Sequence, residues 1–321
     1  MNNLKTLMEE ELGQLRLGCE PQNLYDPIRY LLSLGGKRLR PILVLLGYGL
    51  KKKDLEKIIT PALAVEVFHN FTLMHDDIMD EAPLRRGKPT VHEKWDSNVA
   101  ILSGDTMMVK AYDLLLEGPD HSLKEAMRKF NQCAIEVCEG QQLDMNFETL
   151  ETVSEDQYIE MIRLKTAVLL GFSLEYGGIL AEMNEQDRSL LQQIGEKAGI
   201  GFQLMDDLLD VYGDQAKFGK QVGGDIISNK KTYLLIKALE LANPAQRKHL
   251  DYWLSETSFD PAEKVKAVKE VYQEIGIEAL TKSKMNDYYD QAFDMLDTLE
   301  AEQTGKTALI DFLKKLMKRE R

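Results

Sequence analysis

Two acidic motifs of the form D-D-x-x-D contain the residues of this chain best suited to chemistry. They consist of Asp76, Asp77 and Asp80 and, much later in the chain, of Asp206, Asp207 and Asp210. Residues four apart share a face of a helix, so the first and last carboxylates of each motif line up. Unpaired carboxylates on an apolar helix need cations or an open cavity. Mg²⁺ takes one or two carboxylates together with phosphate oxygens. One motif alone could be an exposed helix end, but two predict facing clusters that share Mg²⁺ ions.

Cationic residues suited to phosphate binding accompany both motifs. A Gly-Gly turn followed by K-R-L-R-P opens a helix, and such a start favours anion binding, although a solvated loop is the alternative. Arg85 and Arg86 follow the first motif, either as salt-bridge partners or as bidentate phosphate ligands. Lys165 lies in an apolar span, from which it could also extend to solvent. The segment 211–231 reads as a basic flap over the second motif or as a solvated loop. The cations are Lys37, Arg38, Arg40, Arg85, Arg86, Lys165, Lys220, Lys230 and Lys231.

Apolar residues recur at helical spacing through the whole chain, and no convincing strand pattern is present. The expected helices include residues 4–17, 25–34, 61–80, 99–116, 122–144, 155–177 and 199–210. Thr60 is a plausible N-cap, with Pro61 at the first helical position. No linker is long enough to divide the chain. The fold class is therefore predicted as all-α, a single large helical bundle around a central cavity that forms one domain over residues 1–321.

Composition and local sequence limit which partners the protein could bind and which compartment it could occupy. The net charge of −13 argues against nucleic acid or an anionic membrane surface as the main partner. The longest apolar run, residues 42–50, is too short to span a bilayer. The N-terminus is amphipathic and acidic, unlike a signal peptide. Cys19, Cys133 and Cys138 fit no metal-ligand spacing, and we expect reduced core thiols in a cytoplasmic protein.

The chemistry expected from these residues is metal-assisted. Carboxylates cannot bind a phosphate directly, so Mg²⁺ must bridge them. No P-loop and no H-E-x-x-H is present, and no arrangement suggests a protein nucleophile. The apolar helix faces before each acidic motif suit a hydrocarbon tail. The sequence therefore points to chemistry on a diphosphate attached to an apolar group.

The ordered set of motifs resembles the trans-isoprenyl diphosphate synthase (polyprenyl synthetase) family. The motifs are G-G-K-R-L-R-P, H-D-D-I-M-D with L-R-R-G-K-P-T, G-Q-Q-L-D, L-K-T, and F-Q-L-M-D-D-L-L-D with G-K and N-K, over residues 35–231. The resemblance implies an isoprenoid synthase fold and a prenyltransferase that condenses isopentenyl diphosphate with dimethylallyl, geranyl or farnesyl diphosphate. It also implies release of pyrophosphate, three Mg²⁺ ions and a homodimer.

The resemblance assigns a role to each matching residue. The metal ligands would be Asp76, Asp80 and Asp206, supported by Asp77, Asp207 and Asp210. The allylic diphosphate would be held by Arg85, Lys165, Lys220 and Lys230, and isopentenyl diphosphate by Lys37, Arg40, His69 and Arg86. Thr166 and Gln203 would face the developing carbocation.

Product length is expected to depend on Phe71 and Thr72, five and four residues before Asp76, because bulk there blocks growth of the tail in this family. One bulky and one modest side chain predict a short-chain synthase, with a geranylgeranyl product favoured over farnesyl. The alternative is a floor on another helix, near Met107 or Met108.

Three rival readings share parts of this pattern. A longer-chain synthase would differ only in the floor of the pocket. A terpene cyclase of the same fold would not need G-G-K-R-L-R-P, and its second metal motif would differ. A non-catalytic subunit of a heteromeric synthase would be expected to lose acidic motifs, and both are intact here.

Overall fold

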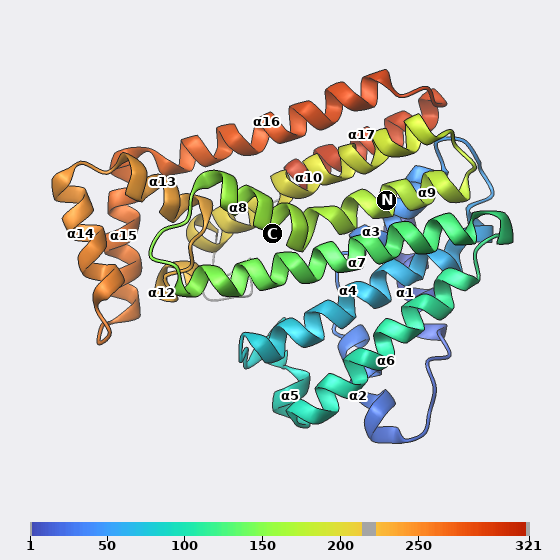
Figure 1. The fold of residues 1–321 in the computed structure, drawn as a ribbon, viewed down its shortest axis with the longest axis horizontal. Coiled ribbons are helices and arrows are strands. Elements are labelled where there is room, and N and C mark those ends of the chain that lie inside the picture. Colours follow the sequence, from blue (N-terminus) through green and yellow to red (C-terminus); the bar gives the residue numbers. More distant parts are fainter. Residues whose placement is uncertain (1, 214–222, 319–321) are drawn as a thin grey trace. The chain divides into compact units, whose positions relative to one another are not determined.

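The computed structural model describes residues 2–213 and 223–318 of the 321-residue chain, and helices dominate it (Figure 1). The prediction of an all-α fold is confirmed. The α-helices are α1 (Asn2–Gln14), α2 (Gln22–Ser33), α3 (Leu39–Tyr48), α4 (Ile59–Met79), α5 (Val91–Lys94), α6 (Ser97–Leu116), α7 (Asp120–Thr149), α8 (Glu155–Ile162), α9 (Val168–Leu180), α10 (Glu185–Tyr212), α12 (Gly224–Ile227), α13 (Tyr233–Leu241), α14 (Pro244–Ser255), α15 (Pro261–Ile275), α16 (Ile277–Thr298) and α17 (Gln303–Met317). A 3₁₀ turn, η1 (Leu55–Ile58), precedes α4, and a π-helical turn, η2 (Arg163–Ala167), separates α8 from α9.

Several helix starts are encoded locally. Asp96 caps α6 by accepting a hydrogen bond from the backbone N–H of Val99 at 2.8 Å. Ser154 and Gln157 form a capping box at the start of α8. Asp260 caps α15 directly before Pro261, which suits the first helical position.

Two local predictions were wrong. Helix α4 begins at Ile59, because η1 leads straight into it, so Thr60 is not its cap. Two short antiparallel strands, β1 (Leu84–Arg85) and β2 (Lys88–Pro89), occur where no strand was expected.

The cysteines also differ from expectation. Only Cys133 is buried, whereas Cys19 and Cys138 are exposed, so they are not core thiols. Neighbouring residues on a helix point in different directions, so a cysteine among apolar neighbours in the sequence can still lie on the exposed face.

The chain separates into two compact units, and the first comprises Met1–Gln132, Leu169–Gln192 and Leu299–Phe312. Its α4 packs along α6 (Figure 1). Aromatic rings fill its core: Phe130 lies 5.0 Å from Phe68 and 5.7 Å from Phe172, between ring centroids. Phe172 stacks on Tyr176 at 5.4 Å. This packing joins α4, which carries the first acidic motif, to the aromatic core of the unit.

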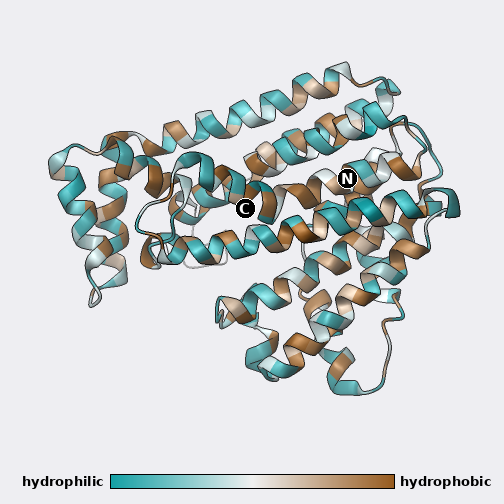
Figure 2. Cartoon of the chain, in the orientation of Figure 1, coloured by the Kyte–Doolittle hydropathy of each residue, from teal (hydrophilic) through white to brown (hydrophobic). Residues whose placement is uncertain are grey.

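The second unit comprises Cys133–Val168, Gln193–Thr298 and Leu313–Arg321. Its α14 and α15 pack against each other, and α15 also contacts α12 and α13 (Figure 1). The hydrophobic core of this unit contains Leu208 and Val211 at the end of α10, together with Val268 and Tyr272 of α15. Figure 2 shows apolar and polar residues alternating along α16, as expected for helices with one buried face.

That residues 1–321 form one domain around a central cavity stays a prediction. Within the described residues, no helix has both the length and the apolar character needed to cross a bilayer.

Candidate active site

The first acidic motif lies on the last turn of α4. The backbone N–H of Asp80 donates to the carbonyl of Asp76 at 2.8 Å, so helical geometry continues to Asp80. Asp76 is half-buried and Asp80 is exposed. Because these residues are four apart, their carboxylates share one face of the helix, as predicted.

Asp77 is buried and is bound by Arg85. The guanidinium donates from Nε to Oδ2 and from Nη2 to Oδ1, both at 2.7 Å. Such bidentate pairs are among the stronger charge-assisted contacts. Of the two readings of Arg85, the salt bridge is therefore present in the structure. Direct ligation of a metal by Asp77 stays a prediction.

Arg86 lies in the turn that connects strand β1 to strand β2. Arg86 and Gly87 both have positive φ, 53° and 73°, as in the two-residue turns that match strand twist. The Arg86 guanidinium reaches Gly36, where an added Cβ would lie 3.2 Å from its Nη atoms. The absence of a side chain at Gly36 therefore lets the first cationic loop and Arg86 approach each other.

Arg38 ties this loop to α4 through a buried ion pair. Its Nη1 donates to Glu66 Oε1 at 2.7 Å, and its Nη2 donates to the carbonyl of Leu32 at 2.8 Å. Both charged side chains are buried, at 3% and 4% exposure. Asn70 Nδ2 also donates to the Glu66 carbonyl at 2.8 Å. Sequence reasoning counted Arg38 as a cation but missed Glu66, whose position within an apolar helix was the available signal.

His69 lies among these cations. Desolvation, followed by the charges of Arg40, Arg85, Arg86 and Arg38, lowers the pKa of its imidazole well below the ordinary value. His69 is therefore neutral near pH 7. The structure thus brings His69, Arg40 and Arg86, all predicted to hold isopentenyl diphosphate, into one electropositive region. Lys37 is exposed on the same loop.

The second acidic motif lies at the end of α10. Asp206 and Asp210 are half-buried, and Asp207 is buried. The Tyr158 hydroxyl and Gln203 Nε2 both donate to Asp207, the latter at 3.1 Å. Burial, with the charge of Asp225, raises the pKa of Asp207 to about 7. Asp207 is thus held inside the protein and anchors Gln203.

Gln203 also accepts a hydrogen bond from Thr166. The distance from Thr166 Oγ1 to Gln203 Oε1 is 3.1 Å. Thr166 lies in the π-helical turn η2, a kind of irregularity that is frequent at functional sites. The two residues predicted to face the carbocation are therefore neighbours.

Lys165 and Lys230 share one carboxylate, that of Asp144. Lys165 Nζ lies 2.6 Å and Lys230 Nζ 3.4 Å from Asp144 Oδ2. Burial opposes ionisation of Asp144, but the two lysines outweigh it and lower its pKa. Gly140 allows the close approach, because an added Cβ would lie 2.2 Å from the Lys165 backbone nitrogen. The sequence placed Asp144 in a motif without giving it a role, and Lys165 does not extend freely to solvent.

Two further predictions concern the residues that limit product length and the basic segment 211–231. Phe71 is buried, and its ring centroid lies 5.5 Å from that of Phe68 and 4.7 Å from that of His75. The Thr72 hydroxyl donates to the carbonyl of His69 at 2.8 Å. Lys220, predicted to bind diphosphate, lies outside the described residues.

The carboxylates suit Mg²⁺ chemically. Mg²⁺ prefers oxygen ligands and is usually bound through one or two carboxylates plus phosphate oxygens. Asp76, Asp80, Asp206 and Asp210 supply oxygen donors that are not fully buried. In residues 2–213 and 223–318, no three His, Cys, Asp or Glu side chains form a compact group that could hold an ion alone.

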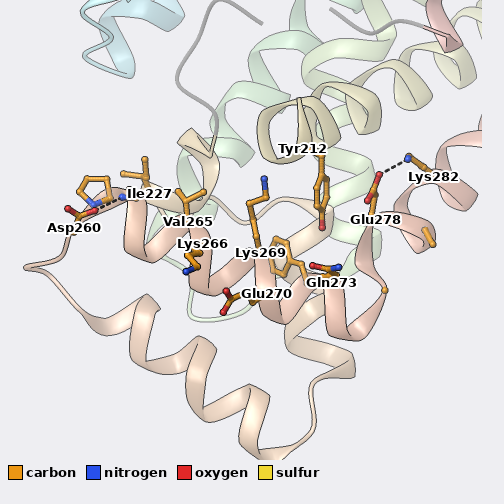
Figure 3. Close-up of a pocket in the computed structure, with 15 residues that line it drawn as sticks. Tyr212, Ile227, Asp260, Val265, Lys266, Lys269, Glu270, Gln273, Glu278 and Lys282 are labelled. Atoms are coloured by element: carbon orange, nitrogen blue, oxygen red, sulfur yellow. Dashed lines mark hydrogen bonds and ion pairs between the residues drawn. The ribbon is translucent and has the colours of Figure 1, made fainter. Parts of the chain in front are cut away.

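A large groove in the second unit is separate from these residues. It has a volume of about 1240 Å³ and lies between the end of α10, α15 and the start of α16 (Figure 3). Lys269 points toward the ring of Tyr212, with Nζ 5.4 Å from its centroid. None of the predicted site residues belongs to its described walls, so we assign it no part in the chemistry.

Comparisons with known proteins find a matching family and similar sequences and structures. The family model described as Polyprenyl synthetase matches residues 21–275. A short chain isoprenyl diphosphate synthase of Methanocaldococcus jannaschii is 43% identical over 228 residues, 71% of this chain and 69% of that protein. A geranylgeranyl pyrophosphate synthase of Geoglobus acetivorans is 43% identical over 236 residues, 73% of this chain and 74% of that protein. A crystal structure of a geranylgeranyl pyrophosphate synthase superposes with a TM-score of 0.95 at 42% identity, covering 100% of this chain and 99% of the other.

Proposed function

We propose the following reaction for this chain, which belongs to the polyprenyl synthetase family and is a trans-prenyltransferase. It joins isopentenyl diphosphate to an allylic diphosphate and releases pyrophosphate. The observation that carries the proposal is the presence of two carboxylate motifs with cations beside them. Arg85 binds Asp77 of the first motif, and the charge of Lys230 acts on Asp207 of the second.

Two sets of cations serve the two diphosphates. Lys37, Arg40, His69 and Arg86 hold isopentenyl diphosphate, and the close approach of the Arg86 guanidinium to Gly36, on the loop that carries Lys37, supports this grouping. Arg85, Lys165 and Lys230, with Lys220, hold the allylic diphosphate. Asp77 orients Arg85, and Asp144 orients Lys165 and Lys230, which limits the side-chain freedom lost on binding.

Three Mg²⁺ ions are proposed to bind with the substrates. Asp76, Asp80 and Asp206 would ligate them, with Asp77, Asp207 and Asp210 in supporting roles. When bound, the metal supplies charge neutralisation for the departing pyrophosphate.

The protein's own groups then promote ionisation of the allylic substrate. Its C–O bond breaks, and the bond electrons leave with pyrophosphate, whose charge Arg85 and Lys165 stabilise. The Gln203 amide and the Thr166 hydroxyl, fixed by their hydrogen bond, face the allylic cation and stabilise it through their oxygen dipoles. The alkene of isopentenyl diphosphate forms the new C–C bond. The proton it then loses goes to the released pyrophosphate, so no protein base is needed.

The proposed product is short, and geranylgeranyl diphosphate is favoured over farnesyl diphosphate. The buried ring of Phe71, one turn and a half before Asp76, supports a floor at this depth. The names of the similar synthases support the same length.

We also propose a cytoplasmic homodimer. Leu102, Val109 and Leu116 of α6 are exposed at 59%, 60% and 54% and lie seven residues apart, so they share one helix face, and an exposed apolar face suits a subunit interface. Cys19, Cys133 and Cys138 form no disulfide with one another, as suits a reducing compartment.

The experiment is a pyrophosphate-release assay with Mg²⁺, isopentenyl diphosphate and an allylic diphosphate. We expect release that requires both substrates and stops on chelation of the metal. Asp206→Asn should lower kcat strongly while the protein stays folded by circular dichroism. Wild-type activity in the Asp206→Asn variant would remove Asp206 from the metal site.

A further inference from the structure

Lys264, on the first turn of α15, is a buried lysine with no carboxylate partner among the described residues. It is 1% exposed. Its Nζ donates to Asn229 Oδ1 at 2.6 Å and to the Ile227 carbonyl at 3.3 Å. It also lies 4.2 Å from the centroid of the Phe259 ring. Burial lowers the pKa of its ammonium group.

An uncompensated buried ammonium is costly, and an apolar side chain of similar length would avoid the cost. The surroundings of Lys264 would accept such a side chain, since Leu250, Val268 and Tyr272 line the same small cavity. The contacts that an apolar side chain could not supply are its position over the Phe259 ring and its two hydrogen bonds to residues 227–229. These bonds therefore identify what Lys264 stabilises.

The segment that Lys264 binds directly precedes Lys230 and is hydrogen-bonded to the second acidic motif. Asn229 has φ 56° and donates from Nδ2 to the Leu254 carbonyl at 3.1 Å. The next residue, Lys230, is hydrogen-bonded from its backbone N–H to the Asp225 carbonyl at 2.8 Å. The N–H of Asp225 in turn donates to Asp210 Oδ2 at 2.9 Å. Residues 223–230 thus connect Lys264 with both Asp210 and Lys230.

We propose that Lys264 is a positioning residue: through Asn229 and Ile227 it fixes the turn that holds Lys230 and Asp210 for the allylic diphosphate. This inference rests on the proposed function and extends it to α15, a helix that contains no recognised motif. Lys264 touches neither substrate nor metal in this account. The buried ammonium group of Lys264 donates a hydrogen bond to Asn229 and so stabilises the left-handed backbone conformation at that residue.

The test uses two variants that remove the contact from either side. Lys264→Met keeps the length of the side chain and removes the donors. Asn229→Gly removes the acceptor, and glycine tolerates the positive φ of this position. We expect each variant to raise KM for the allylic diphosphate about tenfold, with KM for isopentenyl diphosphate within about twofold of wild type. Each single variant also loses a contact of its own, to Ile227 or to Leu254, so the effects of the two substitutions should combine less than additively in the double variant through the Lys264–Asn229 bond that both remove.

Lys266→Met is the matched control, since Lys266 is exposed on the same helix and the substitution changes the net charge equally. It should leave both KM values unchanged. Amide hydrogen exchange of residues 223–232 supplies a readout that does not depend on activity. Exchange at the Asp225 and Lys230 amides should be faster in Lys264→Met and in Asn229→Gly, and unchanged in the control.

These readouts separate the two claims. An inactive wild-type protein with faster exchange in both variants would overturn the proposed function and leave the turn contact established. Unchanged exchange, unchanged allylic KM or additive effects in the double variant would overturn the role of Lys264. If Lys264→Met does not fold, Lys264→Leu, which also removes the donors, takes its place under the same criteria.

Discussion

The ion pair between Arg38 and Glu66 offers the sharpest test of how the first cationic loop is held. Glu66→Gln keeps the shape of the side chain and removes its charge. Arg38 then remains buried at 3% side-chain exposure without a counter-ion, because its second contact is only the Leu32 carbonyl. The perturbation therefore removes one charge and leaves another unsatisfied.

The expected cost follows from burial on both sides of the pair. Removing one partner of a fully buried ion pair destabilises proteins by about 3–5 kcal/mol, whereas replacing both by apolar residues is often neutral. Glu66→Gln should thus lower the free energy of unfolding by an amount in that range. Arg38→Met combined with Glu66→Leu should recover most of it.

The assay is urea unfolding combined with steady-state kinetics. The double variant should be stable but lacks the ion pair that ties the first cationic loop to α4, so KM for isopentenyl diphosphate should rise while KM for the allylic diphosphate stays near wild type. Glu125→Gln is the control, because its bond to Arg188 has the same 2.7 Å length but Glu125 is 42% exposed. It should cost less than about 1 kcal/mol. Wild-type stability in Glu66→Gln would refute the reasoning.

Two other predictions concern product length and pH. Phe71→Ala opens the space beside Phe68 and should lengthen the product, at a cost of about 3–5 kcal/mol in stability; an unchanged chain length by mass spectrometry would place the floor elsewhere. Burial raises the pKa of Glu175 despite its ion pair with Lys129. The folded state therefore keeps this proton at a pH where the unfolded state has lost it, and stability should fall as the pH rises from 4.5 through the raised pKa. Glu175→Gln should remove that part of the pH dependence, and identical unfolding curves against pH in both proteins would show that Glu175 is not perturbed.

Sequence reasoning placed side chains correctly where their position follows from spacing along one helix, while their roles stay predictions. Asp76 with Asp80, and Asp206 with Asp210, needed only the four-residue repeat and the apolar residues before them. The basic residues were found because charge and motif order are visible in the sequence.

What the sequence could not supply were the partners of those residues. Asp77 holds Arg85 across a turn, and Asp144 holds Lys165 from a different helix, and neither contact follows from helical periodicity. Tyr158 and Lys264 were missed because each lies far in sequence from the residue it fixes, Asp207 or Asn229. The short strands escaped notice because two residues cannot establish a period of two.

Product analysis by mass spectrometry tests the central claim most directly. The protein would be incubated with Mg²⁺, isopentenyl diphosphate and, in separate reactions, dimethylallyl, geranyl or farnesyl diphosphate. We predict release of pyrophosphate and accumulation of geranylgeranyl diphosphate. Elongation past that length would contradict the short-chain assignment, and no condensation with any of the three primers would contradict the synthase itself.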